Sequence, residues 1–182
     1  GKDKSGKANQ YEVVASNLRP KLNRLYHAVA SVRLSEPGKA GVTFTLRDLS
    51  DPESEPQSAQ VEHNVVADID GSADLTIGSR DDAERQGWDG LIDSVRIYNQ
   101  PIEYDALIEG KASRDALVGE WTFDKSTGFL KDTSGKGNDL VARGARQWTV
   151  DTPTKPRVAV NAEAMIDFCH VLLNANEFLY VD

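Results

Sequence analysis

Residues 88–99 read Trp-Asp-Gly-Leu-Ile-Asp-Ser-Val-Arg-Ile-Tyr-Asn, and this stretch decides the fold class. Between residues 94 and 98 polar and apolar side chains alternate, which is the period of a strand with one buried face. Gly90 before the alternating run and Asn-Gln-Pro at 99–101 after it are turn residues. The stretch therefore predicts a half-buried β-strand bounded by turns.

Other short segments on either side of this strand show the same pattern. Residues 25–34 and 42–46 alternate most clearly, and residues 11–15, 60–67 and 75–79 are shorter candidates. Short strands divided by turns at regular spacing indicate an all-β sandwich or barrel. We therefore expect an all-β fold.

Two segments instead predict helices. Residues 101–116 begin with Pro101, which the first helical turn tolerates, and acidic residues precede basic ones along them. Residues 161–174 have apolar side chains at helical spacing, and Asn161 can cap their start. We expect a short helix in each place, the second near the C-terminus.

Composition limits the classes of partner. The chain has 182 residues and a net charge of −8, which argues against nucleic acids and anionic membranes, because both favour basic proteins. No apolar run is long enough to span a bilayer, so we expect no membrane insertion. The single cysteine, Cys169, cannot form an internal disulfide. Residues 1–10 are polar and predict a disordered leader.

The stretch 88–99 resembles the closing strand of laminin G-like, concanavalin A-like lectin and glucanase sandwich domains, which typically read F-D-G-x-I-D-E-V-R-I-Y-N there. Leu-Thr-Ile-Gly at 75–78 matches the L-x-I-G of these domains, whereas Tyr26 stands where they usually have Trp. Residues 117–124 and 132–139 resemble their opening motifs, L-x-x-x-W-x-F-D and D-x-S-G-x-G-N-x. The closing motif thus precedes the opening motif in this chain.

This order has two interpretations. We favour one permuted sandwich over residues 11–160, built from the halves 11–100 and 117–160, because separate halves would leave strand edges unpaired. The alternative is the end of one domain followed by the start of another. The resemblance implies a concanavalin A-like jelly-roll β-sandwich with short helices.

The last residues resemble a different family. Residues 161–182 form the predicted C-terminal helix and tail, and D-F-C-H-V-L-L-N-A-N-E-F-L-Y-V-D at 167–182 resembles the extreme C-terminus of planctomycete cytochrome-c-associated proteins of unknown function. This resemblance implies that the chain is part of a larger exported bacterial protein, in the periplasm or on the cell surface. Neighbouring domains of that protein are then expected partners.

The opening motif contains a candidate calcium site. Calcium prefers hard oxygen ligands, and the loop 132–139 offers Asp132 and Asn138 beside glycines. In the resembled domains such a loop sometimes holds calcium together with two further aspartates, which correspond to Asp93 and Asp124 here. The alternative is a turn in which these side chains cap their own backbone.

Carbohydrate is the ligand class that the resemblance implies. Sugars stack on exposed aromatic rings, so Trp88 and Tyr98 are the candidate ligand-binding residues, while Trp121 alternates with Phe123 as a core residue would. No strand carries the E-x-D-x-x-E or E-x-D-x-E carboxylates of the related glucanases, so we expect no enzyme activity. The sequence thus predicts a non-catalytic binding module with carbohydrate as its ligand. The alternative is a structural or protein–protein interaction module without a sugar ligand.

Overall fold

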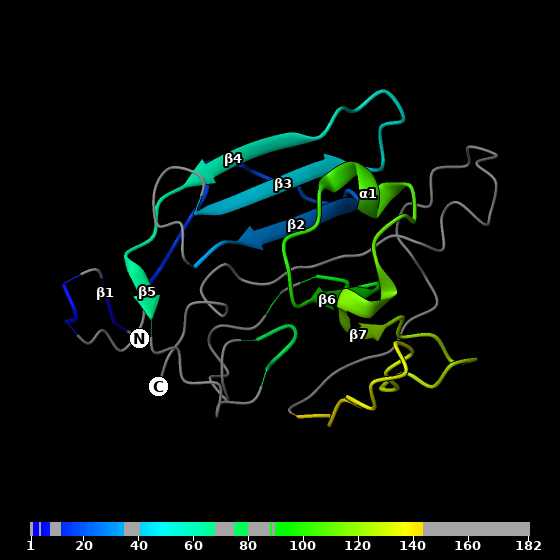
Figure 1. Ribbon diagram of the computed structural model, residues 1–182. Coiled ribbons are helices and arrows are strands. Elements are labelled where there is room, and N and C mark those ends of the chain that lie inside the picture. Colours follow the sequence, from blue (N-terminus) through cyan, green and yellow to red (C-terminus); the bar gives the residue numbers. More distant parts are fainter. Residues whose placement is uncertain are drawn as a thin grey trace.

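The protein is β-rich in the part of the chain that the structure, a computed structural model, describes: residues 2–3, 5–7, 12–34, 41–67, 75–79, 88 and 90–143. The strands are β1 (Lys2–Asp3), β2 (Tyr26–Val32), β3 (Val42–Asp48), β4 (Gln57–Val61), β5 (Val65–Ala67), β6 (Val95–Tyr98) and β7 (Leu117–Trp121). The helical elements are α1 (Tyr104–Ile108) and the 3₁₀ turn η1 (Arg114–Ala116). The predicted β class is confirmed at this level (Figure 1).

The largest sheet is antiparallel, with strand order β2-β3-β4. Its register is continuous from Tyr26 opposite Asp48 to Val32 opposite Val42. One face is apolar because alternate residues of all three strands are apolar, and the irregular segment before β2 packs on this face through Val14. The resulting cluster contains Val14, Val32, Leu34, Val42, Phe44 and Val61.

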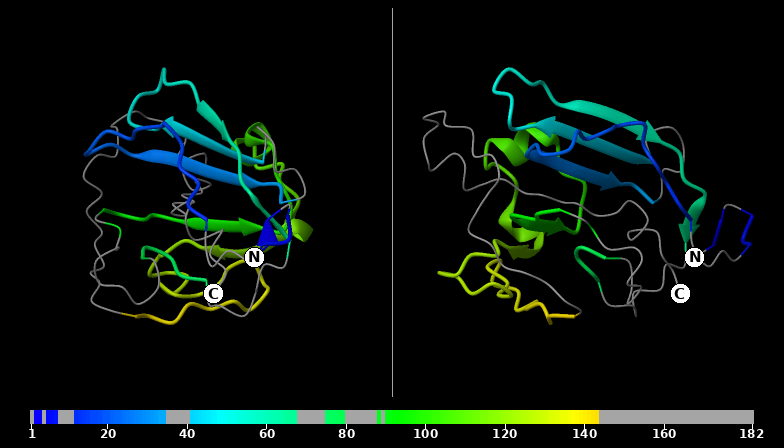
Figure 2. Two further views of the ribbon diagram at one scale, coloured as in Figure 1. Left: turned by 90° about the vertical axis from the view of Figure 1, so that its left-hand side faces the viewer. Right: turned by 180° about the vertical axis from the view of Figure 1, so that it is seen from behind.

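The second pair, β6 and β7, joins the two halves of the sequence. Val95 lies opposite Trp121 and Ile97 lies opposite Gly119 in an antiparallel ladder. The strand of the closing motif therefore pairs with the strand of the opening motif, as one permuted sheet requires. Figure 2 shows this pair as a separate layer below the three-stranded sheet, with α1 to one side.

Several elements differ from the sequence-based predictions. Strand β6 begins at Val95 rather than near residue 91. Val95 lies opposite Trp121, and β7 ends at Trp121 because Phe123 has a positive φ of 52° and turns the chain away from the sheet. The helix predicted over 101–116 is split into α1 and η1, and Gly110, at φ 65°, lies between them.

The strand boundaries also shift elsewhere. Residues 12–15 are irregular, residues 75–79 contain only an isolated bridge, and β4 starts at Gln57, before the candidate strand expected over residues 60–67. In the predicted leader, β1 pairs with β5, and the Asp3 carboxylate accepts hydrogen bonds from the amides of Ser5 and Lys7. These hydrogen bonds are local, because they join residues two and four positions apart.

The C-terminal helix and tail predicted over residues 161–182 lie outside the described residues, as does the cysteine. Within the described ranges, no helix combines the length and the apolar character needed to cross a membrane.

Candidate functional site

The outer edge of β7 is covered by side chains of the loop that follows it. The Asn138 amide nitrogen donates to the Val118 carbonyl at 2.8 Å, and the Glu120 N–H donates to the Asp132 carboxylate at 3.0 Å. The Thr133 N–H donates to the Glu120 carbonyl at 2.8 Å. We call Asp132, Thr133 and Asn138 the edge clasp, because they satisfy backbone groups that another strand would otherwise satisfy.

Asp132 is the centre of the edge clasp. Besides the Glu120 N–H, its carboxylate accepts hydrogen bonds from the N–H groups of Ser134 at 2.8 Å and Asn138 at 2.9 Å. Partial desolvation raises the pKa of Asp132, but the hydrogen bonds from Ser134, Asn138 and Glu120 outweigh it and lower the pKa to about 2. The carboxylate is therefore ionised at all ordinary pH values.

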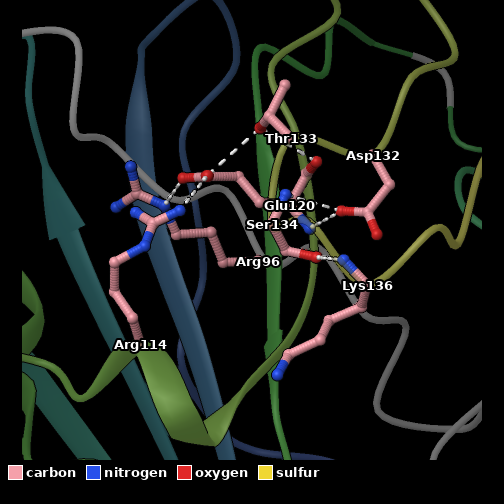
Figure 3. A network of polar contacts seen from close by, with 7 residues as sticks. All are labelled: Arg96, Arg114, Glu120, Asp132, Thr133, Ser134 and Lys136. Carbon is pink, nitrogen blue, oxygen red and sulfur yellow. Dashed lines mark hydrogen bonds and ion pairs between the residues drawn. The ribbon is translucent and has the colours of Figure 1, made fainter.

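A buried carboxylate ties the clasp to both strands. Glu120 accepts a hydrogen bond from Arg96 Nε at Oε1 (2.6 Å) and from Thr133 Oγ1 at Oε2 (3.1 Å), and Oε2 also lies 3.7 Å from a guanidinium nitrogen of Arg114 (Figure 3). Arg96 and Glu120 are cross-strand partners, and both are largely buried. A carboxylate held by two guanidinium groups stabilises the position of the loop.

The four predicted calcium ligands are only partly brought together. Asp132 and Asn138 are hydrogen-bonded within the loop, whereas Asp93 and Asp124 are exposed. In the described ranges no group of three or more His, Cys, Asp or Glu residues is arranged to hold a metal ion. Because N–H donors already approach Asp132, a cation would have to use its remaining lone pairs. Calcium binding stays a prediction.

Trp88 is a surface aromatic with a fixed backbone. Its side chain is 46% exposed, and its N–H donates to the Gly78 carbonyl at 2.6 Å. Gly90 lets the indole approach the chain, since a Cβ there would lie 2.7 Å from Trp88 Nε1. Leu75 and Leu91 are also exposed, on the two segments joined by this hydrogen bond.

Trp121 shows the opposite environment. It is 3% exposed, and its indole N–H donates to the Asn138 carbonyl at 2.9 Å. It also covers a glycine two residues away, because a Cβ on Gly119 would lie 2.3 Å from the ring. The predicted core role of Trp121 is confirmed. Tyr98 is half-buried at the end of β6.

A second polar contact joins α1 to the large sheet. His27 of β2 is buried, and its Nδ1 lies 3.1 Å from the Tyr104 hydroxyl, with ring centroids 5.3 Å apart. Burial raises the pKa of Tyr104 to about 12, with Asp105 acting in the same direction and Arg47 against it. This pair positions α1 over the polar side of β2.

Sequence reasoning missed the network of Arg96, Glu120 and Thr133. The signal was present in part, because Arg96 and Glu120 both alternate with apolar residues in their strands. For the polar loop 132–139, the capping alternative given above describes part of the observed role of Asp132, and the additional hydrogen bond from the Glu120 N–H of β7 was not predicted.

Comparison with known protein families, curated proteins and solved structures found no match.

Proposed function

We propose that this chain is a non-catalytic carbohydrate-binding module of a larger exported bacterial protein, with a concanavalin A-like jelly-roll architecture. The observation that carries the proposal is the exposure of Trp88. Tryptophan side chains are on average highly buried in folded proteins, so an exposed one is unusual. The export and the architecture rest on the sequence resemblance.

Trp88 has the properties of a stacking platform. A sugar ring presents apolar C–H groups that an exposed aromatic face can cover, and polar groups around the ring then fix its orientation. The hydrogen bond to Gly78 and the close approach to Gly90 restrict the residue before any ligand arrives. A restricted platform loses less conformational entropy on binding.

The experiment is a glycan array followed by titration of any bound glycan with three variants. Trp88→Ala should weaken binding on the order of 30-fold, the loss expected for a central aromatic contact of about 2 kcal/mol. Trp88→Phe should retain part of the affinity because it keeps a ring. Leu91→Ala is the matched control, since Leu91 is 50% exposed but has no aromatic face.

An array without hits would reject the carbohydrate proposal. Equal affinities for Trp88→Ala and the unchanged chain would reject Trp88 as the contact, even if a glycan bound elsewhere.

Calcium is part of the proposal as a cofactor held by Asp93, Asp124, Asp132 and Asn138. A ligand that binds only the native state raises its stability, so millimolar calcium should raise the melting temperature and a chelator should reverse the rise. Asp93→Asn should abolish the response without disturbing the edge clasp. A melting temperature independent of calcium and chelator would remove the cofactor from the proposal.

The alternative function, a protein-interaction module, is favoured by a different observation. The outer edge of β4 carries no partner strand within the described residues, and Trp88 is not part of this sheet.

A further inference from the structure

The orientation of the β4 backbone follows from the hydrogen bonds at the two ends of β2 and β3. Arg33 N–H donates to the Gly41 carbonyl, and Leu49 N–H donates to the Leu25 carbonyl. Antiparallel ladders alternate between bonded and non-bonded pairs, so odd-numbered residues of β3 bond to β2 and even-numbered ones bond to β4. Gln57, Ala59 and Val61 therefore complete the ladder with β3.

The remaining backbone groups of β4 point away from the sheet. The N–H and C=O groups of Ser58 and Gln60 face outward, and both residues are exposed. No strand of the described part of the chain continues the sheet on this side, and Figure 1 shows β4 at its upper margin. These groups form a ready set of two donors and two acceptors for an added strand.

This edge lacks the usual protection against pairing. Its sequence, Gln-Ser-Ala-Gln-Val, contains no lysine, no proline and no other charge, and its register with β3 has no bulge. Natural proteins commonly use charged residues, proline and β-bulges to prevent edge-to-edge association, and β4 has none of these. The free edge of β4 is therefore competent to pair.

Acidic residues flank the strand on both sides. Glu55 lies before β4 and Glu62 follows it, and both are exposed. Neither forms an ion pair with another described residue. Among the described residues, the edge is thus an uncharged strand between two negative charges that have no ion-pair partner there.

We propose that the free edge of β4 binds an extended segment of a partner protein that has basic residues on both sides of a short alternating strand. Lysine or arginine flanks would meet Glu55 and Glu62. Pairing with a second copy of this chain is disfavoured, because an antiparallel arrangement centred on Ala59 places Glu62 of one copy near Glu55 of the other.

The two sides of the sheet specify the alternation of the added strand. Ala59 and Val61 lie on the side of the apolar cluster, so the facing residues of the partner should be apolar. Ser58 lies on the other side, where its hydroxyl is 2.9 Å from that of Thr45, so small polar residues suit that side.

The test uses a labelled synthetic peptide, Lys-Lys-Val-Thr-Val-Thr-Val-Lys-Lys, and a second peptide in which glutamates replace the lysines. Binding is followed by fluorescence anisotropy, and amide hydrogen exchange is measured residue by residue. We expect the basic peptide to slow exchange at Ser58 and Gln60 at least tenfold, whereas the ladder amides of Ala59 and Val61 are protected already.

Two variants separate the contributions of hydrogen bonding and charge. Gln60→Pro removes one outward N–H without removing a ladder bond, and it should weaken the basic peptide at least tenfold while the melting curve shows that the chain still folds. The double change Glu55→Lys with Glu62→Lys should weaken the basic peptide on the order of tenfold and improve binding of the acidic one. Asp115→Lys, an exposed charge on η1, is the matched control.

Three results would overturn the proposal. One is unchanged exchange at Ser58 and Gln60 with millimolar basic peptide. Another is equal binding of the acidic and basic peptides. The third is protection of the same two amides that rises with the concentration of the chain alone, which would assign the edge to a second copy.

Discussion

The outer edges of β7 and β4 are treated in opposite ways. On β7, the edge clasp covers Val118 and Glu120 with hydrogen bonds from a loop. On β4, the outward groups of Ser58 and Gln60 have no such cover among the described residues. Both strands are five residues long, so strand length does not explain the difference.

The difference shows that an edge can be closed without a further strand. Three residues of one loop provide a carboxylate acceptor, an amide donor and a backbone N–H at the spacing of the strand that they cover. The loop then gains support from Glu120 and its arginines, which come from β6 and η1. No loop of the described ranges covers β4 in this way, and within them its edge is left for pairing.

The largest expected effect on the closed edge comes from Glu120→Ala. Removing one partner of a largely buried ion pair leaves Arg96 without its carboxylate, and we expect a loss of about 3 kcal/mol in the free energy of unfolding. Urea denaturation measures it. Arg114→Ala is the control, since the Arg114 side chain is 70% exposed and its loss should cost less than about 1 kcal/mol. Equal losses would show that the buried pair does not support the clasp.

Asp132→Ala should open the edge of β7 more selectively. Three backbone N–H groups lose their acceptor, and the expected loss is about 2 kcal/mol, at the upper end for a capping carboxylate. Hydrogen exchange at the Glu120 amide should accelerate. If that amide stayed protected, the clasp would not be what covers the edge. Ser134→Ala provides a neighbouring control that keeps the carboxylate.

Acid should weaken the same edge reversibly. The pKa of Asp132 is about 2 in the folded chain, below its ordinary value of 3.8, so its contribution is fully present above about pH 4 and is lost as the pH falls through about 2. The effect should be smaller than that of Asp132→Ala, because a protonated carboxyl keeps one acceptor oxygen. Stability measured between pH 5 and pH 2 should fall less in Asp132→Ala than in the unchanged chain. Parallel curves would contradict the assignment.

The other edge of the large sheet is β2, and the contact of β2 with α1 through His27 and Tyr104 can be tested by mutation. Tyr104→Phe removes the hydrogen bond to His27 and should cost about 1 kcal/mol. Because the folded pKa of Tyr104 is about 12, above its ordinary value of 10.0, its contribution is present below pH 10 and is lost as the pH rises toward 12. Absorbance of tyrosinate should show one late-titrating tyrosine, absent from Tyr104→Phe. Tyr26→Phe is the control.

The smallest effect is expected on the open edge itself. Gln60→Ala should change the free energy of unfolding by less than about 0.5 kcal/mol, since the side chain is exposed and the ladder with β3 uses other residues. A loss above about 1 kcal/mol would show that this edge is already covered in the native state.

Sequence reasoning predicted β2 and β3, because alternation of polar and apolar side chains is a local signal. It placed β4 too late, since Gln57 and Ser58 look like loop residues until β3 lies beside them. It predicted that Trp121 is buried, and it named Trp88 as a candidate exposed aromatic residue. It did not predict the network of Arg96, Glu120 and Thr133. This network depends on residues that are far apart in the chain.

The sequence by itself determined the β class, the alternating faces of β2 and β3, and the short turns rich in glycine and aspartate. These features follow from backbone geometry and side-chain polarity within a few residues. Only the tertiary structure decided that Asp132 caps β7, that Glu120 lies between two arginines, and that no described strand pairs with the outer edge of β4. The reason is that a hydrogen bond across a sheet edge depends on which distant segment arrives there, and local preferences carry no information about it.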